Sequence, residues 1–212
     1  MYPAPSASCS RSIRVKEPTD RSSRIVHHSC GVKGWLASTP SVDAVRPGRC
    51  PECGAASRPT GGKLGLHGHG LRERQVRGPL DPDGPSVCVT VACRRFRCEF
   101  CKAIVMVVPR GVAPHRHYGY AAIAMAFTLW MLVGMPVTEV RRRVCAWPIS
   151  DESPSRWPTL RRWARAARAA LGCGSPDRAA ARWAQIAIGN APTHLRDGPL
   201  WAQAFAGGNA MP

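Results

Sequence analysis

Acidic side chains are scarce in this 212-residue chain, with 13 Asp and Glu against 30 Lys and Arg and a formal net charge of +17. No acidic run is present that could neutralise the basic residues within the chain. Nearly all of the positive charge is arginine, whose planar guanidinium can donate two hydrogen bonds to one phosphate. This imbalance favours nucleic acid or an anionic membrane surface as partner, although a compositional bias toward Ala, Arg, Gly and Pro also inflates the arginine count.

The N-terminus lacks the apolar core of a secretory signal, because residues 1–12 are polar. Ten cysteines in a chain without such a signal indicate metal binding before disulfides, since a reducing compartment keeps thiols free. We therefore expect a cytoplasmic, nucleoid-associated protein. Its length suits one ordinary domain or two small ones, and small domains benefit from a metal that holds them together.

Two Cys-x-x-Cys pairs give the strongest chemical signal, Cys50 with Cys53 and Cys98 with Cys101. Each pair can place two thiolates beside a tetrahedral ion, and two pairs complete its coordination. We interpret them as one structural zinc site. Four thiolates complete the coordination of the ion, so no position stays open for a substrate. Redox cysteines are the competing interpretation. A different ligand set would include Cys93 or a histidine from His67, His69, His115 and His117, none of which has a partner at this spacing.

The segments around these pairs predict a small β-rich zinc ribbon over residues 46–117. Alternation of apolar residues predicts a strand over 86–98, and weaker patterns predict strands over 70–77 and 104–108. The 44 residues between Cys53 and Cys98 exceed the usual ribbon gap and require inserted strands of this kind. Residues 1–45 are rich in Ser, Pro, Arg and Thr and predict a basic arm that is mostly disordered, apart from a short ordered segment around Trp35.

The second half of the chain predicts helices. Residues 118–138 carry no charged side chain, which requires a membrane span to be considered, but the run contains Gly134 and Pro136 and has arginine at both ends. We prefer a buried helix over 120–133, followed by helices over 137–145, from the Ser155–Pro158 region to 171, and from 176. The predicted fold class is α+β: a zinc ribbon, a helix-turn-helix-like domain over 118–188, and a flexible tail over 189–212.

The helix that ends at Gly172 has an apolar face and an opposite face of four arginines. In a helix-turn-helix this basic face would lie along the major groove of DNA, whereas the alternative is a solvated face on a structural helix. Further arginines cluster near the second cysteine pair and in the preceding helix. The candidate nucleic-acid contacts are Arg72, Arg74, Arg94, Arg95, Arg97, Arg141, Arg142, Arg143, Arg161, Arg162, Arg165 and Arg168.

The order of these motifs resembles the zinc-ribbon N-terminal region of bacterial transposases and related short transposon-associated proteins. The likeness lies in Cys50 to Gly54, Gly68 to Arg74, Arg94 to Cys101, Val107 to Tyr120, and the helix start Pro158 to Trp163. It implies binding to transposon ends or other DNA, with the four cysteines as zinc ligands. The chain departs from a full transposase because no strand-borne carboxylates for a nuclease domain follow the ribbon.

We therefore expect a non-catalytic zinc-ribbon protein that binds double-stranded DNA. No nucleophile–base pair or open metal position indicates an enzyme. One alternative is an interaction module that docks on a transposase or polymerase. Another is a small membrane protein with a span at 118–138 and a cytoplasmic zinc domain.

Overall fold

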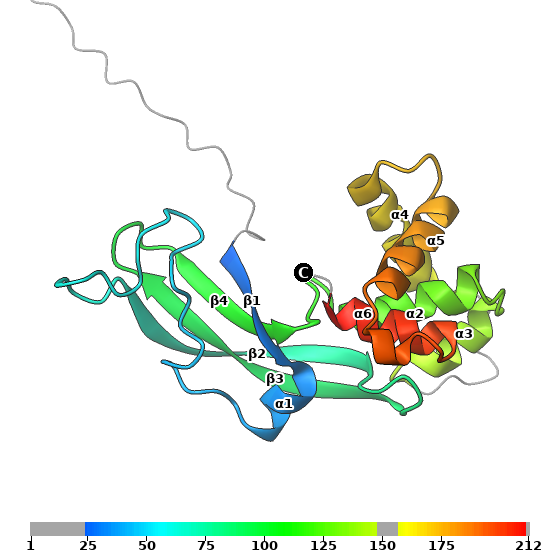
Figure 1. Cartoon of the computed structure of the whole chain (residues 1–212), viewed down its shortest axis with the longest axis horizontal. Helices are drawn as coiled ribbons and strands as arrows, with labels where there is room; N and C mark the ends of the chain where they lie inside the picture. The colour runs from blue at the N-terminus through cyan, green and yellow to red at the C-terminus, as the bar shows by residue number, and fades with distance from the viewer. Residues whose placement is uncertain (1–23, 148–156, 211–212) are drawn as a thin grey trace, which may run out of the picture.

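The computed structural model describes residues 24–147 and 157–210 and has mixed α+β content. Four strands form one sheet in the order β1-β4-β3-β2, and helices α2 to α6 gather at one end of it (Figure 1). The strands are β1 (Ile25–Gly31), β2 (Leu66–Pro79), β3 (Ser86–Cys98) and β4 (Ile104–Arg110). β1 runs parallel to β4, and the other neighbours are antiparallel.

The three strands expected from the sequence are present, and the strand over 86–98 has the expected bounds. The strand expected over 70–77 is longer at both ends, because β2 pairs with β3 along nearly its whole length. A bulge between Gly68 and Leu71 interrupts this pairing, and Gly70 adopts a positive φ of 83° within it. The bulge therefore adds one residue to β2 beside the middle of the sheet.

The two faces of the sheet have different coverings. Helix α1 (Val32–Ala37) lies against one face, where the buried indole of Trp35 donates a hydrogen bond to the carbonyl of Ala92 in β3 at 2.9 Å. Phe96 and Val105 are direct cross-strand neighbours and fully buried in the same core cluster as Trp35. The opposite face carries arginines and forms the groove described below.

The prediction that residues 1–45 are mostly disordered is wrong for residues 25–30, which belong to β1, whereas the ordered segment expected around Trp35 is present as helix α1. Residues 1–23 lie outside the described residues. β1 is formed through parallel pairing with β4, for example Val26 with Val107. Its own sequence has no strong strand pattern. The backbone hydrogen bonds that order this segment come from a partner about 80 residues away in the chain, which no local pattern reveals.

The helical part follows the expected boundaries closely. Its helices are α2 (Tyr120–Met131), α3 (Val137–Val144), α4 (Pro158–Leu171), α5 (Pro176–Gly189) and α6 (Leu200–Ala210), with a short 3-10 turn η2 (Thr193–Leu195). Gly172 ends α4 in the left-handed conformation, and the Ser175 hydroxyl caps α5 by accepting the Arg178 N–H. Ser155, expected to cap α4, lies outside the described residues.

The packing of the helices is centred on α2. This helix packs mainly against α5 and α6, whereas α4 packs mainly against α5 and touches α2 only lightly. Most of the apolar face expected for α4 is buried: Leu160, Trp163, Ala164 and Ala167 are at most 5 % exposed, whereas Leu171 at the end of the helix is half-buried. The arginine face of α4 is exposed, as expected.

The uncharged run over 118–138 is divided between α2, a turn at Gly134 and the start of α3. α2 contains 12 residues, or roughly 18 Å of helix at 1.5 Å per residue, against about 30 Å of hydrocarbon in a bilayer. Among the described residues, no helix is long and apolar enough to cross a membrane. A span at 118–138 would need one helix across the whole run, which the turn at Gly134 divides.

The prediction of a flexible tail over 189–212 is also wrong for 200–210, because α6 packs between α2 and α5. Glycines permit the close approach. A Cβ added to Gly208 would lie 2.9 Å from the Ala121 Cα, and one added to Gly207 would lie 1.7 Å from the Ala187 carbonyl oxygen. α6 is apolar on more than one side, so its sequence shows no clear helical period.

We expect Gly207→Ala to destabilise the protein by about 3 kcal/mol, because the added methyl group forces α6 away from the α5 backbone. Gly189→Ala is the matched control, since a Cβ at that position of α5 meets nothing within 4 Å. It should be neutral or stabilising by up to about 1 kcal/mol. Urea unfolding monitored by circular dichroism measures both. Equal stabilities of the two variants would contradict the packing of α6.

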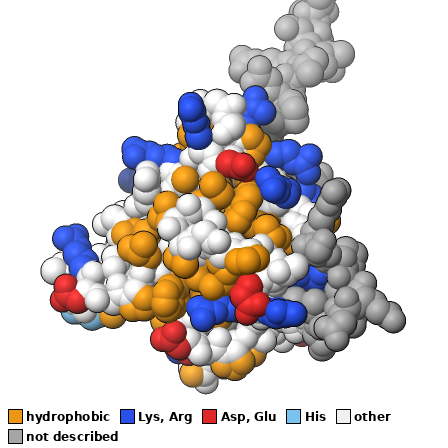
Figure 2. Space-filling view, turned by 90° about the vertical axis from the view of Figure 1, so that its right-hand side faces the viewer, with side chains coloured by type: hydrophobic (Ala, Val, Ile, Leu, Met, Phe, Trp, Pro, Cys, Tyr) orange, Lys and Arg blue, Asp and Glu red, His pale blue; other side chains and the backbone are white. Residues whose placement is uncertain are grey.

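Hydrophobic side chains gather on the surface of the helical end, with Lys and Arg around them (Figure 2). Large hydrophobic residues with high exposure in this part of the chain include Val133 at 43 % and Leu200 at 42 %. The charged side chains of the molecule therefore lie outside the centre of this face.

Candidate metal centre and basic groove

Four cysteines from two distant segments meet at one end of the sheet. The sulfur atoms of Cys50 and Cys101 lie 3.7 Å apart, and those of Cys53 and Cys98 also lie 3.7 Å apart. All four sulfurs lie within 4.8 Å of one another. Among the described residues, no other group of three or more His, Cys, Asp or Glu is close enough to share a metal ion. The expected set of ligands is thus brought together.

The two Cys-x-x-Cys turns have the same backbone design. The N–H of Cys50 donates to the Ala55 carbonyl, and the N–H of Cys98 donates to the Ala103 carbonyl five residues ahead. The residue after each second cysteine, Gly54 or Lys102, donates back to the carbonyl of the first cysteine and has a positive φ of 72° or 60°. The turns are therefore two copies of one structure facing each other.

Backbone N–H groups point at the sulfurs. Burial opposes ionisation of Cys98, but the N–H groups of Cys101 and Phe100 and neighbouring thiols lower its pKa to about 7. Cys101 differs, because burial and the other three thiols raise its pKa to about 12. One thiolate forms readily in this cluster and the last forms with difficulty, because like charges accumulate. A bound cation would remove that repulsion, so the donor set fits a divalent metal.

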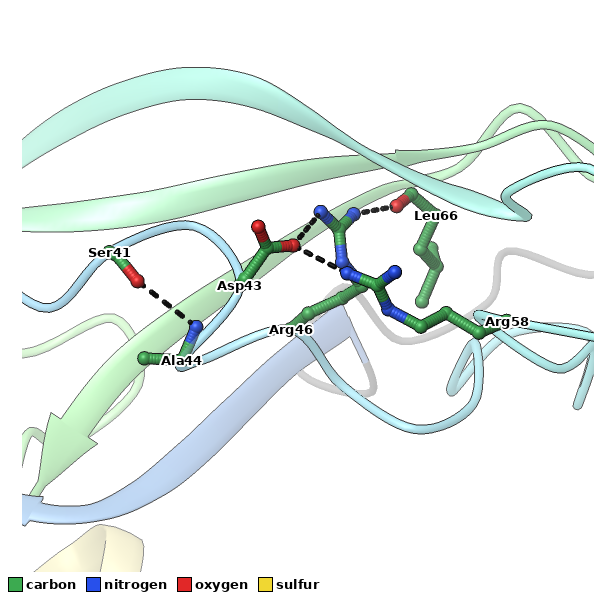
Figure 3. A network of polar contacts seen from close by, with 6 residues as sticks. All are labelled: Ser41, Asp43, Ala44, Arg46, Arg58 and Leu66. Carbon is green, nitrogen blue, oxygen red and sulfur yellow. Dashed lines mark hydrogen bonds and ion pairs between the residues drawn. The ribbon is translucent and has the colours of Figure 1, made fainter.

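The surrounding chain holds the first turn in place. Figure 3 shows the guanidinium of Arg46 between the Asp43 carboxylate and the Leu66 carbonyl at the start of β2. Arg58, from the loop after the first turn, also donates to Asp43 at 2.6 Å. Hydrogen bonds from Arg46, and then its charge, lower the pKa of Asp43. Arg46 also lies 5.5 Å above the Phe96 ring and so joins this loop to the sheet core.

We expect Gly54→Ala to destabilise the protein by about 1 kcal/mol, because an L-residue with positive φ is strained by about that amount. The space around a new Cβ at Gly54 is open, so the cost is one of backbone conformation alone. Gly48→Ala, in the same loop with open space and no left-handed φ, is the control and should be neutral or slightly stabilising. Thermal unfolding of the metal-loaded protein compares them. A harmless Gly54→Ala would contradict the left-handed turn.

Arginines from β2 and β3 line a groove of about 690 Å³ on the sheet face opposite α1. Register explains their convergence. Arg95, Met106 and Ile25 are direct neighbours across β3, β4 and β1, so their side chains form a row on one face. Arg72 and Arg74 continue the row on β2, where Arg72 is paired with Cys93. The groove is lined by the arginines Arg24, Arg72, Arg74, Arg95 and Arg116, together with His115 and His117 and one acidic residue, Glu73.

Most of these arginines are available for an anion. Among the described residues no ion pair is formed by Arg72, Arg95 or Arg116, and the Nε atom of Arg95 is buried without an acceptor. Arg74 donates to the carbonyls of Ala113 and Arg116 and so supports the loop after β4. The groove therefore combines several uncompensated positive charges with a concave shape.

The other arginines expected to contact nucleic acid lie elsewhere. Arg97 is exposed and pairs with Ile104 at the border of the groove, whereas Arg94 is on the opposite face and donates to the Pro40 carbonyl at 2.9 Å. The remainder belong to α3 and α4, outside the groove lining. Several of these contact neighbours: Arg142 pairs with Glu139, and Arg161 pairs with Asp177.

Two arginines of the groove were missed from the sequence, Arg24 and Arg116. Arg24 donates two hydrogen bonds to Glu52, between the first two cysteines, and so joins the groove to the metal centre. Arg116 comes from the loop between β4 and α2, where His115 adopts a positive φ of 55°. A left-handed non-glycine residue directly before Arg116 marks an unusual loop, but this signal exists only in three dimensions.

Comparison of the chain with protein-family models, with curated proteins and with solved structures gave no match.

Proposed function

We propose that this protein is a non-catalytic nucleic-acid-binding protein that is stabilised by a structural zinc ion. In this proposal its basic groove binds the phosphate backbone of double-stranded DNA. The observation that carries the proposal is the convergence of five arginines on one concave face of the sheet. Arginine suits this role because its planar fork matches phosphate oxygens.

The geometry of the sulfurs supports zinc as the metal. A tetrahedral zinc ion with Zn–S bonds of about 2.3 Å separates its sulfurs by about 3.8 Å. Two of the sulfur–sulfur distances are 3.7 Å, and all four sulfurs lie within 4.8 Å of one another. Four thiolates complete the coordination of such an ion, so the metal braces the turns that lead into β2 and β4 and does not carry out a reaction.

Position supports the groove as the main interface. The groove lies between the metal centre and the helices. Arg24 lines the groove and contacts Glu52 of the metal centre, and Arg116 lines both the groove and a pocket among the helices. The exposed arginines of α4 offer a second contact area, as in a helix-turn-helix, and the resemblance to transposase zinc ribbons adds transposon ends to the candidate DNA sites. We assign α4 the smaller part because its Arg161 is already paired with Asp177 and stacked on Trp130.

A second candidate is a module that docks on another protein, such as a transposase or polymerase. The hydrophobic surface of the helical end supports it, because its centre is apolar and its margin carries charged side chains of both signs (Figure 2). The two candidates use different faces of the molecule. Unlabelled duplex DNA should compete with a partner bound to the groove and not with one bound to the helical end.

Titration of the metal-loaded protein with labelled duplex DNA at several salt concentrations tests the proposal. Each phosphate contact contributes about 0.9 to the slope of log affinity against log salt. Five arginines in the groove predict a slope steeper than about −3. A slope near zero, or no measurable binding at low salt, would refute the proposal.

A further inference from the structure

A second, apolar pocket of about 190 Å³ opens among α2, α4 and α5. Its walls are aromatic: Tyr120 and Phe127 of α2, Trp163 of α4 and Trp183 of α5. Three alanines of α4 leave the space that larger side chains would fill, among them Ala170. Sites for drug-sized ligands begin at about 300 Å³, so this pocket is of a size for one flat ring system.

The pocket adjoins the basic groove. Arg116 lines both of them. A second link runs through β1, where Ile25 lines the groove and the ring of His27 lies 6.4 Å from that of Tyr120 in the pocket wall. Burial and then the charge of Arg74 lower the pKa of His27, so this link is uncharged at pH 7. A ligand whose backbone follows the arginines can therefore reach the aromatic walls.

The walls of the pocket include the ring of Trp183, which lies close to that of Tyr120. The indole N–H of Trp183 is buried and has no acceptor among the described residues. Its ring lies 6.2 Å from that of Tyr120 at an angle of 33°, so two of the walls are tilted toward a parallel arrangement. A flat heterocycle can stack on these rings, whereas an aliphatic chain cannot.

We propose that this pocket receives one unpaired nucleobase of a nucleic acid whose phosphates lie in the basic groove. The preferred ligand is therefore a duplex with an unpaired nucleotide, and not a fully paired duplex. The inference rests on the proposed nucleic-acid function and adds the class of ligand. Aromatic walls recognise the face of the base, which every base possesses, so the preference is for an unpaired base of any kind.

The test compares three labelled DNAs of equal length in fluorescence anisotropy: a full duplex, the duplex with one unpaired nucleotide, and the same DNA with that nucleotide abasic. The abasic form keeps the phosphate and removes only the base. We expect the wild-type protein to bind the base-bearing DNA roughly 10-fold more tightly than the abasic DNA, from stacking of one base.

Two variants isolate the pocket. Ala170→Phe fills it, and we expect the 10-fold preference to disappear while affinity for the full duplex is unchanged. Ala169→Phe places the same group on a neighbouring exposed residue that does not line the pocket, and should keep the preference. Thermal unfolding establishes that both variants fold.

The outcomes separate the two proposals. Equal wild-type affinity for base-bearing and abasic DNA would overturn the nucleobase pocket, leave the groove function intact, and point to an apolar side chain of a partner protein as the occupant. A preference that survives in Ala170→Phe would also overturn it. Absence of binding to all three DNAs at low salt would overturn both the inference and the proposed function.

Discussion

Cys98→Ser is expected to abolish binding of the metal ion and to unfold the protein. Cys98 is the last residue of β3 and is fully buried, so its thiolate joins the metal centre directly to the sheet. Binding of structural zinc contributes about 10–16 kcal/mol at pH 7, as much as the whole stability of an ordinary domain, about 5–15 kcal/mol. Cys50→Ser should have the same effect, because both cysteines belong to the one cluster that could hold a metal ion.

Metal content by mass spectrometry and circular dichroism after purification measure the two effects. Cys88→Ser is the matched control, since Cys88 is an exposed cysteine of the same strand and lies outside the cluster. It should retain one metal ion per chain and its melting temperature. A full equivalent of metal in Cys98→Ser or Cys50→Ser would contradict a centre of four cysteines.

The double variant Arg72→Ala/Arg95→Ala is expected to weaken binding to duplex DNA on the order of 100-fold, since each hydrogen bond to a charged group contributes about 1.5 kcal/mol or more. Both residues line the groove and form no ion pair among the described residues, so their removal leaves no buried acid without a partner. The slope of log affinity against log salt should fall by about 2.

Arg161→Ala/Arg165→Ala is the matched comparison, because it also removes two positive charges, but from a different surface, the exposed face of α4. We expect its salt slope to fall by less than 1, since only distant charges are lost. Isotherms for both variants at three or more salt concentrations decide between the surfaces. A larger loss in the α4 variant would assign the main interface to a helix-turn-helix-like unit and remove it from the groove.

The four-cysteine cluster and most elements could be predicted from sequence because their signals are local. A Cys-x-x-Cys turn fixes two ligands within four residues, and the chain needs only to bring two such turns together. The start of helix α5 is also marked locally. The cap at Ser175 and the proline at the next residue indicate it without information from the rest of the fold.

The groove could not be predicted as a site because it depends on register and topology. The sequence marked Arg94 and Arg95 alike, yet adjacent residues of a strand point to opposite faces, and only pairing with β4 places Arg95 beside Met106 and Ile25. Arg24 joined the site only because β1 adds to the edge of the sheet, in a segment whose composition indicated disorder.

The sequence by itself thus determined the metal centre, the strands that enter and leave it, the helix boundaries and the strongly basic character of the protein. The tertiary structure alone decided that β1 and α6 are ordered and which arginines share a surface. The reason is physical. Turns, caps and periodic faces are set by residues a few positions apart, whereas β1 is ordered by hydrogen bonds to β4 and α6 by contact with α2 and α5, all distant in the chain.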